Sequence, residues 1–344
     1  MLARPANHAL LGEVLVYKKE KQRMVVDKLK PGDHIRIIAP AQSLLPKLTQ
    51  EMRIRGVKRL EELGLTVSFG DHVHEIDEFG STTIDNRLAD LHRAYEDKSV
   101  KAILAVSGGT TSNQLLPYID YKLLKDNPKI LCGLSDITAL INTVYAKTDV
   151  VTYYGPHFSM LSAGEDLGFS LDYFRACLFD DKPISLSPSP FYYNSIWEHE
   201  QLDNPGYWVI NEGDVEGKIL GGNFLTFNFL QGSEYLPDTS DSIFFLEDNG
   251  PEDYKNVQNQ LQALLNQPSF SGVKALAIGR FKQNSMMTKE ILAKIIKTKK
   301  QLDGIPVIAN IDFGHTLPMI TIPIGGRARV IAGPTNPVIE LLMH

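Results

Sequence analysis

Residues 129–144 read KILCGLSDITALINTV and give the sharpest local signal in the chain. The apolar run KILCG predicts a buried strand, the residues from Gly133 to Asp136 predict a tight turn, and the apolar segment after them predicts a helix. Parallel sheets flanked by helices bind their ligands at the carboxyl ends of the strands. The hydroxyl group of Ser135 is therefore expected to project at the sheet edge where a ligand would bind.

The same alternation of strands and helices extends on both sides of this stretch, from Asp33 to about Ala163. Strand patterns at HIRIIAP, LTVSFG and VKAILAVSGG alternate with amphipathic helical patterns at residues 48–64 and 83–97. This order predicts an α/β fold with a mostly parallel sheet and helices on both of its faces. We expect this N-terminal domain, which carries Ser135, to cover residues 24–163.

Residues 164–215 interrupt the alternation, because they are rich in Pro, Ser, Asn and aromatic residues and have no clean period. We expect them to form an inter-domain crossing and a long aromatic loop. Trp197 and Trp208 in this segment are candidates for the wall of a substrate site. Burial of both side chains against the second domain is an equally good interpretation.

The two ends of the chain differ in character. Residues 216–344 contain short strand patterns and two helical patterns, which predict a compact, β-rich α+β domain at the C-terminus. Residues 1–23 contain an apolar patch followed by a basic stretch, the reverse of the order in a secretory signal. We expect this first segment to be an extension outside the folded core.

The composition excludes several classes of protein. The chain of 344 residues has 35 Lys and Arg against 41 Asp and Glu, a net charge of −6 that argues against binding to nucleic acid or to an anionic membrane. Two cysteines, Cys132 and Cys177, are too few for a disulfide framework or a structural zinc site. No uncharged apolar stretch approaches the roughly 20 residues that span a bilayer. We therefore expect a cytoplasmic globule, in which Cys132 is a small buried hydrophobe rather than a nucleophile.

The turn after the strand KILCG offers a nucleophile. Attack by Ser135 would develop negative charge on a substrate oxygen, and the N–H group of Asp136 at the start of the helix could stabilise it. The spacing resembles the G-x-S-x-G turn of serine hydrolases, although Ile137 replaces the last glycine. The alternative is that Ser135 or Asp136 only caps the helix.

A glycine pair follows the preceding strand and lies at the same expected edge. Gly108 and Gly109 let the backbone approach a ligand closely, so their N–H groups could complete an oxyanion hole or bind a carboxylate. A simple turn is an equally good interpretation of the pair. A dinucleotide site is a poor one, because no G-x-G-x-x-G motif is present.

A serine nucleophile needs a base, and the base usually needs a partner that orients it. Among nine histidines, His315 follows a strand and a glycine and is well placed to face a cleft. Glu247 ends the apolar strand SIFFLE, where a carboxylate must find a partner or solvent. Both residues are also compatible with purely structural roles, and His157 and His199, in or near loops, stay open as further candidates.

An ordered set of motifs resembles the serine peptidase family of LD-carboxypeptidases (muramoyltetrapeptide carboxypeptidases) and microcin C7 self-immunity proteins, peptidase family S66. The resemblance extends from about Lys30 to Pro334, and each motif alone is weak. In chain order the motifs are Ile37-Ile38-Ala39-Pro40, Asp85-Asn86-Arg87-Leu88, Ser107-Gly108-Gly109, Leu116-Pro117-Tyr118, Gly133-Leu134-Ser135-Asp136, Gly221-Gly222-Asn223, Leu246-Glu247-Asp248 and Asp312-Phe313-Gly314-His315-Thr316.

The resemblance implies a fold and a site. It implies a Rossmann-like N-terminal sheet, a swivelling-barrel-like C-terminal domain, and a cleft between them. Ser135, Glu247 and His315 would form a catalytic triad in that chain order, with the N–H groups of Asp136 and Gly109, and less surely Gly108, as the oxyanion hole. Similar proteins are usually homodimers and need no metal or cofactor.

One departure indicates the branch of the family. Carboxypeptidase members often carry Arg-Gly-Gly-Tyr where this chain has Ser107-Gly108-Gly109-Thr110. This form, with the loop that carries Trp197 and Trp208, looks more like the microcin-immunity branch, in which a loop aromatic can stack on a nucleobase. The expected substrate is a small peptide or a peptidyl- or aminoacyl-nucleotide conjugate. A murein tetrapeptide is the alternative substrate, and a non-catalytic small-ligand binder is the alternative from another class.

Overall fold

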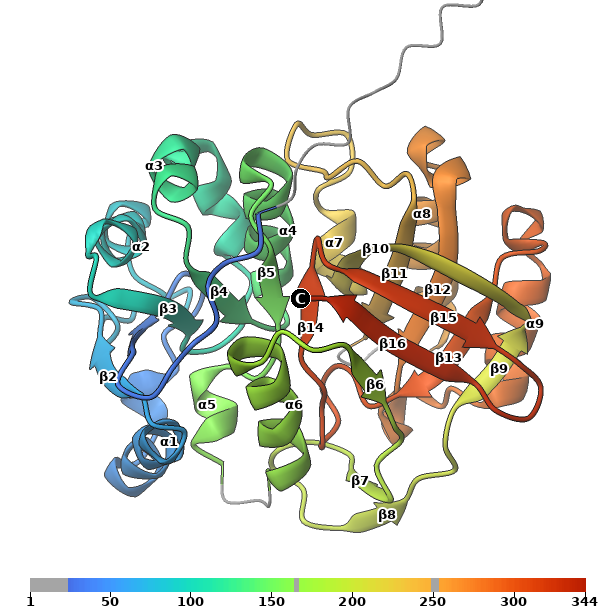
Figure 1. Cartoon of the computed structure of the whole chain (residues 1–344), viewed down its shortest axis with the longest axis horizontal. Helices are drawn as coiled ribbons and strands as arrows, with labels where there is room; N and C mark the ends of the chain where they lie inside the picture. The colour runs from blue at the N-terminus through green and yellow to red at the C-terminus, as the bar shows by residue number, and fades with distance from the viewer. Residues whose placement is uncertain (1–23, 164–166, 249–253) are drawn as a thin grey trace, which may run out of the picture.

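The computed structural model describes residues 24–163, 167–248 and 254–344. The predicted extension, residues 1–23, lies outside the described residues. Two large sheets lie next to each other, with the first half of the chain on the left of Figure 1 and most of the second half on the right. No helix in the described ranges has the length and apolar character needed to cross a membrane.

The N-terminal sheet has six strands in the order β14-β5-β4-β3-β1-β2, and its first five strands along the chain are parallel. The predicted alternation of strands and helices is confirmed. The strands are β1 (His34–Ile38), β2 (Thr66–Phe69), β3 (Val100–Ala105), β4 (Ile130–Gly133), β5 (Thr152–Tyr154) and β14 (Ile322–Ile324). The helices are α1 (Gln50–Glu62), α2 (Ile84–Glu96), α3 (Tyr121–Asp126), α4 (Ile137–Thr148), α5 (Phe158–Leu161) and α6 (Gly168–Phe179), with short 3-10 turns η1 (Leu45–Lys47) and η2 (Ser112–Tyr118).

Local sequence explains where these helices start. Thr49 and Thr83 cap α1 and α2, because each side chain accepts a hydrogen bond from a backbone N–H group of the first turn. The helical spacing of Leu88, Leu91 and Tyr95 places all three on the buried face of α2. The pattern of caps and apolar spacing therefore fixes both the position and the orientation of α2.

The C-terminal sheet has eight strands in the order β6-β16-β15-β10-β11-β12-β13-β9. Its centre, from β10 to β13, is parallel, and the outer strands pair antiparallel, so the predicted β-rich α+β character is confirmed. The strands are β6 (Ile184–Leu186), β9 (Trp208–Asn211), β10 (Gly213–Asn223), β11 (Ser242–Glu247), β12 (Val273–Gly279), β13 (Val307–Ile311), β15 (Arg327–Ala332) and β16 (Val338–Met343). The helices are α7 (Phe224–Asn228), α8 (Tyr254–Leu265) and α9 (Lys289–Lys297), with 3-10 turns η3 (Pro268–Gly272), η4 (Gln283–Ser285) and η5 (Lys300–Leu302).

The described part of residues 164–215 is more regular than the long loop expected from its composition. It contains α6, which buries Phe174 and Cys177, and the edge strands β6 and β9 of the C-terminal sheet. A two-stranded ribbon of β7 (Phe191–Tyr193) and β8 (Gln201–Asp203) carries the remaining loop. The strands are short and pair with segments distant in sequence, so no local period reveals them.

Two connections join the sheets close to the predicted nucleophile. The strand β14 comes late in the chain but pairs with β5, at the boundary between the sheets in the middle of Figure 1. The amide of Asn142 on α4 donates to the carbonyl oxygen of Gly221 at 2.7 Å, and the N–H group of Asn223 donates to Thr138 Oγ1 at 2.9 Å. The helix that follows Ser135 is therefore tied directly to β10 of the other sheet.

Candidate active site

Ser135 lies in the turn between β4 and α4 with a φ of +64°. Residues other than glycine rarely adopt positive φ, and those that do are concentrated at functional sites. Asp136 occupies the N-cap position of α4 without a side-chain hydrogen bond to the helix. Asp136 therefore holds the N-cap position that the alternative interpretation predicted, but its side chain does not cap the helix.

The side chain of Asp136 has another function in the fold. Its Oδ2 atom accepts hydrogen bonds from the N–H groups of Thr111 and Ser112 at 2.9 and 2.8 Å. Burial raises the pKa of Asp136 above its ordinary value, although these hydrogen bonds act in the opposite direction. The carboxyl group thus fastens the loop that follows β3 to the turn that holds Ser135.

Gly108 is the part of that loop closest to Ser135. A Cβ atom added to Gly108 would lie 2.6 Å from Ser135 Cβ, 2.9 Å from Ser135 Oγ and 3.3 Å from the nitrogen of Asp136. Only glycine fits there, and its backbone lies directly beside the serine hydroxyl group. The structure therefore places Gly108 beside Ser135 and Asp136, while its neighbour Gly109, the glycine first predicted for the oxyanion hole, packs against Gln42.

Gln42 holds the neighbouring Gly109 in place, and sequence reasoning missed this residue. The N–H group of Gln42 donates to the carbonyl oxygen of Gly108 at 3.1 Å, and Ser107 Oγ donates to the carbonyl oxygen of Gln42 at 2.9 Å. A Cβ atom on Gly109, whose φ is +152°, would lie 2.8 Å from the nitrogen of Gln42. The glycine pair is thus packed against the segment that follows β1.

Glu247 and His315 form a buried pair. Glu247 ends β11 with a fully buried side chain, and its Oε2 atom lies 2.6 Å from His315 Nδ1. A Cβ atom on Gly314, whose φ is +111°, would lie 2.5 Å from Glu247 Oε2, so a glycine is required for this approach. Burial opposes the charged form of Glu247, but its hydrogen bonds and the charge of His315 outweigh burial and lower the pKa of Glu247 below its ordinary value.

Two residues that sequence reasoning missed satisfy the other oxygen of Glu247. Tyr154, at the end of β5, donates from its hydroxyl group to Glu247 Oε1 at 2.7 Å. Asn223 donates its amide to the same oxygen at 3.0 Å, while its Oδ1 atom accepts from the N–H group of Thr226 and fixes the amide orientation. Tyr154 was detectable only as a polar group at the carboxyl end of a parallel strand, and Asn223 only as the last residue of Gly221-Gly222-Asn223.

Tyr154 also reaches the serine turn. Its hydroxyl oxygen accepts a hydrogen bond from the N–H group of Ser135 at 3.0 Å. Burial raises the pKa of Tyr154 well above its ordinary value, so the hydroxyl group keeps its proton and can donate it to Glu247. A chain of two hydrogen bonds therefore connects the backbone of Ser135 in one sheet to the carboxylate of Glu247 in the other.

A buried ion pair supports the loop that carries His315. Arg280 Nη2 lies 2.7 Å from Asp312 Oδ1, with both side chains almost fully buried. Asp312 also accepts hydrogen bonds from the N–H group and the hydroxyl group of Ser189. The ring of Tyr192 packs on the guanidinium group of Arg280, with 4.5 Å between the ring centroid and Cζ. The segment that crosses between the sheets is thereby anchored to the His315 loop.

The two tryptophans occupy different environments. Trp197 lies between β7 and β8 and is 56 % exposed. Trp208 lies in the edge strand β9, pairs with Ala309 of β13 and packs half-buried against the core. Cys132 is buried as expected, and burial raises the pKa of its thiol group.

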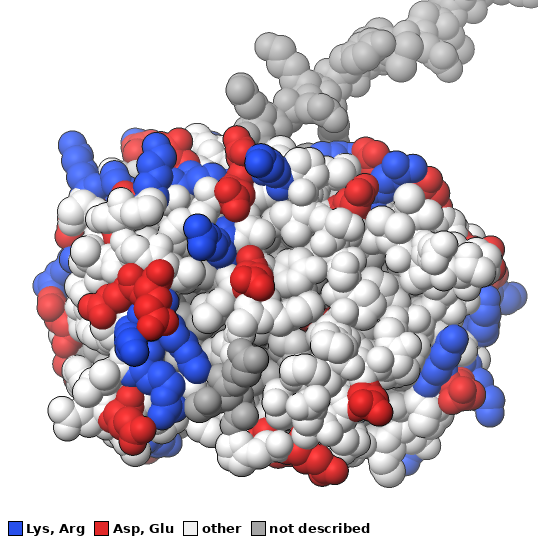
Figure 2. All heavy atoms as spheres, turned by 60° about the horizontal axis from the view of Figure 1, so that its bottom comes forward, with Lys and Arg blue, Asp and Glu red and all other residues white. Residues whose placement is uncertain are grey.

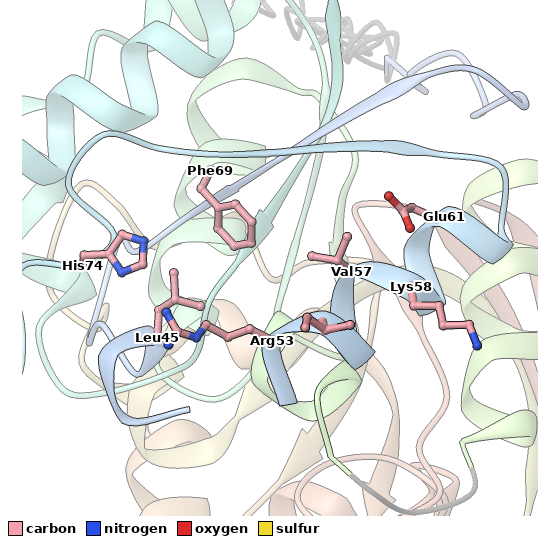
Figure 3. Close-up of a pocket in the computed structure, with 8 residues that line it drawn as sticks. Leu45, Arg53, Val57, Lys58, Glu61, Phe69 and His74 are labelled. Atoms are coloured by element: carbon pink, nitrogen blue, oxygen red, sulfur yellow. The ribbon is translucent and has the colours of Figure 1, made fainter. Parts of the chain in front are cut away.

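A cavity of about 590 Å³ lies beside α1 and is lined by other residues. Figure 3 shows the ring of Phe69 and the side chain of Val57 on its apolar walls, with Lys58, Glu61 and His74 at its border. None of the predicted site residues lines this cavity. On the face shown in Figure 2, Lys and Arg are interspersed with Asp and Glu, and no extended basic surface is present on that face.

Comparison with known proteins identifies the family of the chain. Residues 35–155 match the LD-carboxypeptidase N-terminal domain of peptidase family S66, and residues 216–330 match its C-terminal domain. YocD of Bacillus subtilis strain 168 is 46 % identical over 314 residues, which cover 90 % of this chain and 96 % of YocD. The crystal structure of an MccF-like protein from Bacillus anthracis is 44 % identical, with a TM-score of 0.91 over 93 % of this chain and 100 % of that one.

A more distant structure carries a ligand. Microcin C7 self-immunity protein MccF in complex with aspartyl sulfamoyl adenosine is 26 % identical, with a TM-score of 0.84 over 93 % of this chain and 99 % of that one. The matched domains together cover most of the described chain in the order that the motifs predict. The chain belongs to the LD-carboxypeptidase family, peptidase family S66.

Proposed function

We propose that this protein is a serine peptidase that hydrolyses an amide bond with Ser135, Glu247 and His315 as its catalytic triad. The observation that carries the proposal is the hydrogen-bonded connection from the backbone of Ser135 through Tyr154 to Glu247, whose other oxygen binds His315. Because Glu247 binds Nδ1 of His315, the other ring nitrogen, Nε2, is left to act as the base. This is the arrangement of a serine triad.

The reaction follows from these roles. Ser135 Oγ attacks the amide carbonyl carbon while His315 takes the hydroxyl proton. His315 then donates this proton to the amide nitrogen, and the C–N bond breaks. The amine departs, and the acyl group stays bonded to Ser135 as an ester. Water hydrolyses the ester with His315 again as the base, and Glu247 holds the imidazole orientation and stabilises the imidazolium throughout.

The oxyanion would be held by the N–H groups of Asp136 and Gly109, with Gly108 as a weaker candidate. Support comes from the close approach of Gly108 to Ser135 and to the nitrogen of Asp136. A donor of this kind contributes about 3–4 kcal/mol to stabilisation of the transition state. The amino-terminal end of α4 adds a favourable dipole.

We propose a small peptide or an aminoacyl- or peptidyl-nucleotide conjugate as the substrate, as in the microcin-immunity branch. The complex of MccF with aspartyl sulfamoyl adenosine supports this choice, as does the exposed Trp197, whose indole face is free to stack on a base. Trp208 is the second candidate for such a contact. A murein tetrapeptide is the alternative, supported by the family's LD-carboxypeptidase members.

The resemblance also supports a cytoplasmic homodimer that needs no metal or cofactor. Sedimentation of the purified chain tests the dimer, and activity that survives a chelating agent tests the independence from metals.

A side-by-side assay tests the function. Purified protein is given a murein tetrapeptide and aspartyl sulfamoyl adenosine, and release of the amine product is measured for the wild type and for Ser135→Ala. We expect turnover of at least one substrate, and more of the nucleotide conjugate, with complete loss in Ser135→Ala. Turnover that survives Ser135→Ala would exclude the triad, and binding of either compound without turnover would favour a non-catalytic binding protein.

A further inference from the structure

His157 lies at the same sheet edge as Ser135, and the proposed triad does not use it. It comes three residues after Tyr154, the last residue of β5. The N–H group of Gly155 donates to the carbonyl oxygen of Gly133 at 3.2 Å, and the N–H group of Ser159 donates to that of Val106 at 2.9 Å. The segment that carries His157 is thus fixed to the ends of β3 and β4.

The hydrogen bonds of the ring define its tautomer. Nδ1 of His157 lies 3.3 Å from the backbone nitrogen of Met160 and 3.0 Å from Ser159 Oγ. The N–H group of Met160 is shared between the carbonyl oxygen of His157 at 3.0 Å and Nδ1, and because this group can only donate, Nδ1 accepts and carries no proton. The proton of the neutral ring is therefore on Nε2, which makes Nε2 a hydrogen-bond donor.

The ring stays neutral. His157 is 9 % exposed, and burial, aided by the nearby charge of His315, lowers the pKa of His157 to about 3. A neutral ring beside His315 does not repel the imidazolium that forms there during the reaction. His315 therefore lies near enough to His157 to influence its charge.

The donor on Nε2 is left without a partner. Within the part of the chain that the structure describes, Nε2 of His157 makes no hydrogen bond, although Nδ1 makes two. Several side-chain nitrogen and oxygen atoms of that part are fully buried without a hydrogen-bond partner, and Nε2 of His157 is not one of them. Nε2 therefore keeps some exposed surface. The hydrogen bonds of Nδ1 hold the ring in place, so the Nε2–H group is suited to donate to a ligand oxygen.

We propose that the Nε2–H group of His157 binds the leaving-group part of the substrate, by donating to an anionic or strongly polar oxygen next to the scissile nitrogen. A C-terminal carboxylate supplies such an oxygen in a peptide, and a sulfamoyl or phosphoryl group supplies it in a nucleotide conjugate. Hydrogen bonds to charged oxygens are stronger than neutral ones. This inference rests on the proposed function, since it places the leaving group beside His315.

Two substitutions separate binding from a structural role, because His157 also caps α5 through Nδ1. His157→Asn keeps an acceptor near Nδ1, and asparagine is a good N-cap residue, but it removes the distant donor. His157→Gln keeps a donor near Nε2 and weakens the cap. If the role of His157 is purely structural, His157→Gln should lose more activity than His157→Asn. If His157 binds the substrate, His157→Asn should lose more.

The assay uses the full-length chain and whichever of the two substrates the wild type hydrolyses. We expect His157→Asn to melt at the wild-type temperature but to lose about 10-fold or more in kcat/KM, mainly through KM, because the lost contact exists before the transition state. We expect His157→Gln to retain kcat/KM within about threefold. Wild-type kinetics for His157→Asn, or greater damage in His157→Gln, would overturn the inference. For a peptide substrate, His157→Asn should also lose the wild-type preference for a C-terminal carboxylate over a carboxamide, and a preserved preference would exclude the carboxylate as its partner.

Failure of the proposed function remains distinguishable from failure of this inference. Nitrogen-15 NMR of the histidine rings in the unliganded protein reports the tautomer without any turnover. A ring protonated at Nε2 alone supports the inference even if neither substrate is hydrolysed. A ring protonated at Nδ1 overturns it even if both are.

Discussion

Tyr154 donates a hydrogen bond at 2.7 Å to Glu247 across the boundary between the two sheets, although the two residues are 93 positions apart in sequence. The same oxygen of Tyr154 accepts the N–H group of Ser135, so one phenol links the proposed nucleophile turn to the proposed orienting acid. Loss of this hydroxyl group should therefore affect both stability and activity.

Tyr154→Phe should lower the free energy of unfolding by about 1–3 kcal/mol, because a buried carboxylate loses a donor. It should also lower kcat, since the position of Glu247 and the turn of Ser135 both depend on the phenol. Tyr153→Phe is the matched control, because the hydroxyl group of Tyr153 is buried without a hydrogen-bond partner in the described residues. Urea unfolding and steady-state kinetics give the comparison, and equal effects of the two substitutions would contradict the role of Tyr154.

The positive φ of Ser135 predicts a difference in stability between two inactive variants. Ser135→Gly should be more stable than Ser135→Ala by about 1 kcal/mol, because glycine adopts left-handed conformations without strain while alanine does not. Both variants lack the hydroxyl group and should be inactive. Thermal unfolding of the two variants side by side measures the difference, and an Ala variant as stable as the Gly variant would show that the turn is not strained.

Gly108→Ala should inactivate the protein without unfolding it. The added methyl group would contact Ser135 Oγ at 2.9 Å and displace it, and a misplacement of about 1 Å can cost about 100-fold in rate. Gly333→Ala is a suitable control, because its added Cβ atom would have no neighbour closer than 3.8 Å. Comparable activity in the two variants would remove Gly108 from the immediate surroundings of the serine.

The lowered pKa of Glu247 predicts how stability depends on pH. Below its ordinary pKa of 4.5 the unfolded chain binds a proton at Glu247 that the folded protein still excludes, so stability falls as the pH falls from 4.5 through the lower folded pKa. Glu247→Gln removes this proton uptake. Urea unfolding between pH 3 and pH 7 should therefore show the wild type losing its advantage over Glu247→Gln in acid, and parallel curves would refute the assignment.

Much of the molecule could be predicted from local patterns. The strands and helices around Ser135 follow from apolar spacing and caps, and the positions of Glu247 and His315 follow from motifs at strand ends. The relations between these motifs are long-range and could not be predicted from the residues alone. Nothing near Tyr154 in sequence indicates Glu247, and nothing near Gln42 indicates Gly109.

The differences between expectation and structure have a common physical origin. The strands β6 and β9 lie in a segment of mixed composition, and each exists because a distant strand offers hydrogen bonds to its backbone. His157 could not be assigned from sequence, because its tautomer depends on the hydrogen bonds of α5. Local propensity therefore located the elements, while tertiary contacts determined which polar groups meet.

The pairing of β14 with β5 has a consequence for synthesis of the protein on the ribosome. The N-terminal sheet needs residues 322–324 to cover the open edge of β5, and those residues are made only after most of the C-terminal sheet. A nascent chain that has completed only its first half therefore exposes an unpaired strand next to the turn of Ser135. The sheet that presents the serine is completed only after β14 has been made, so a chain that stops before β14 should leave this edge of β5 open.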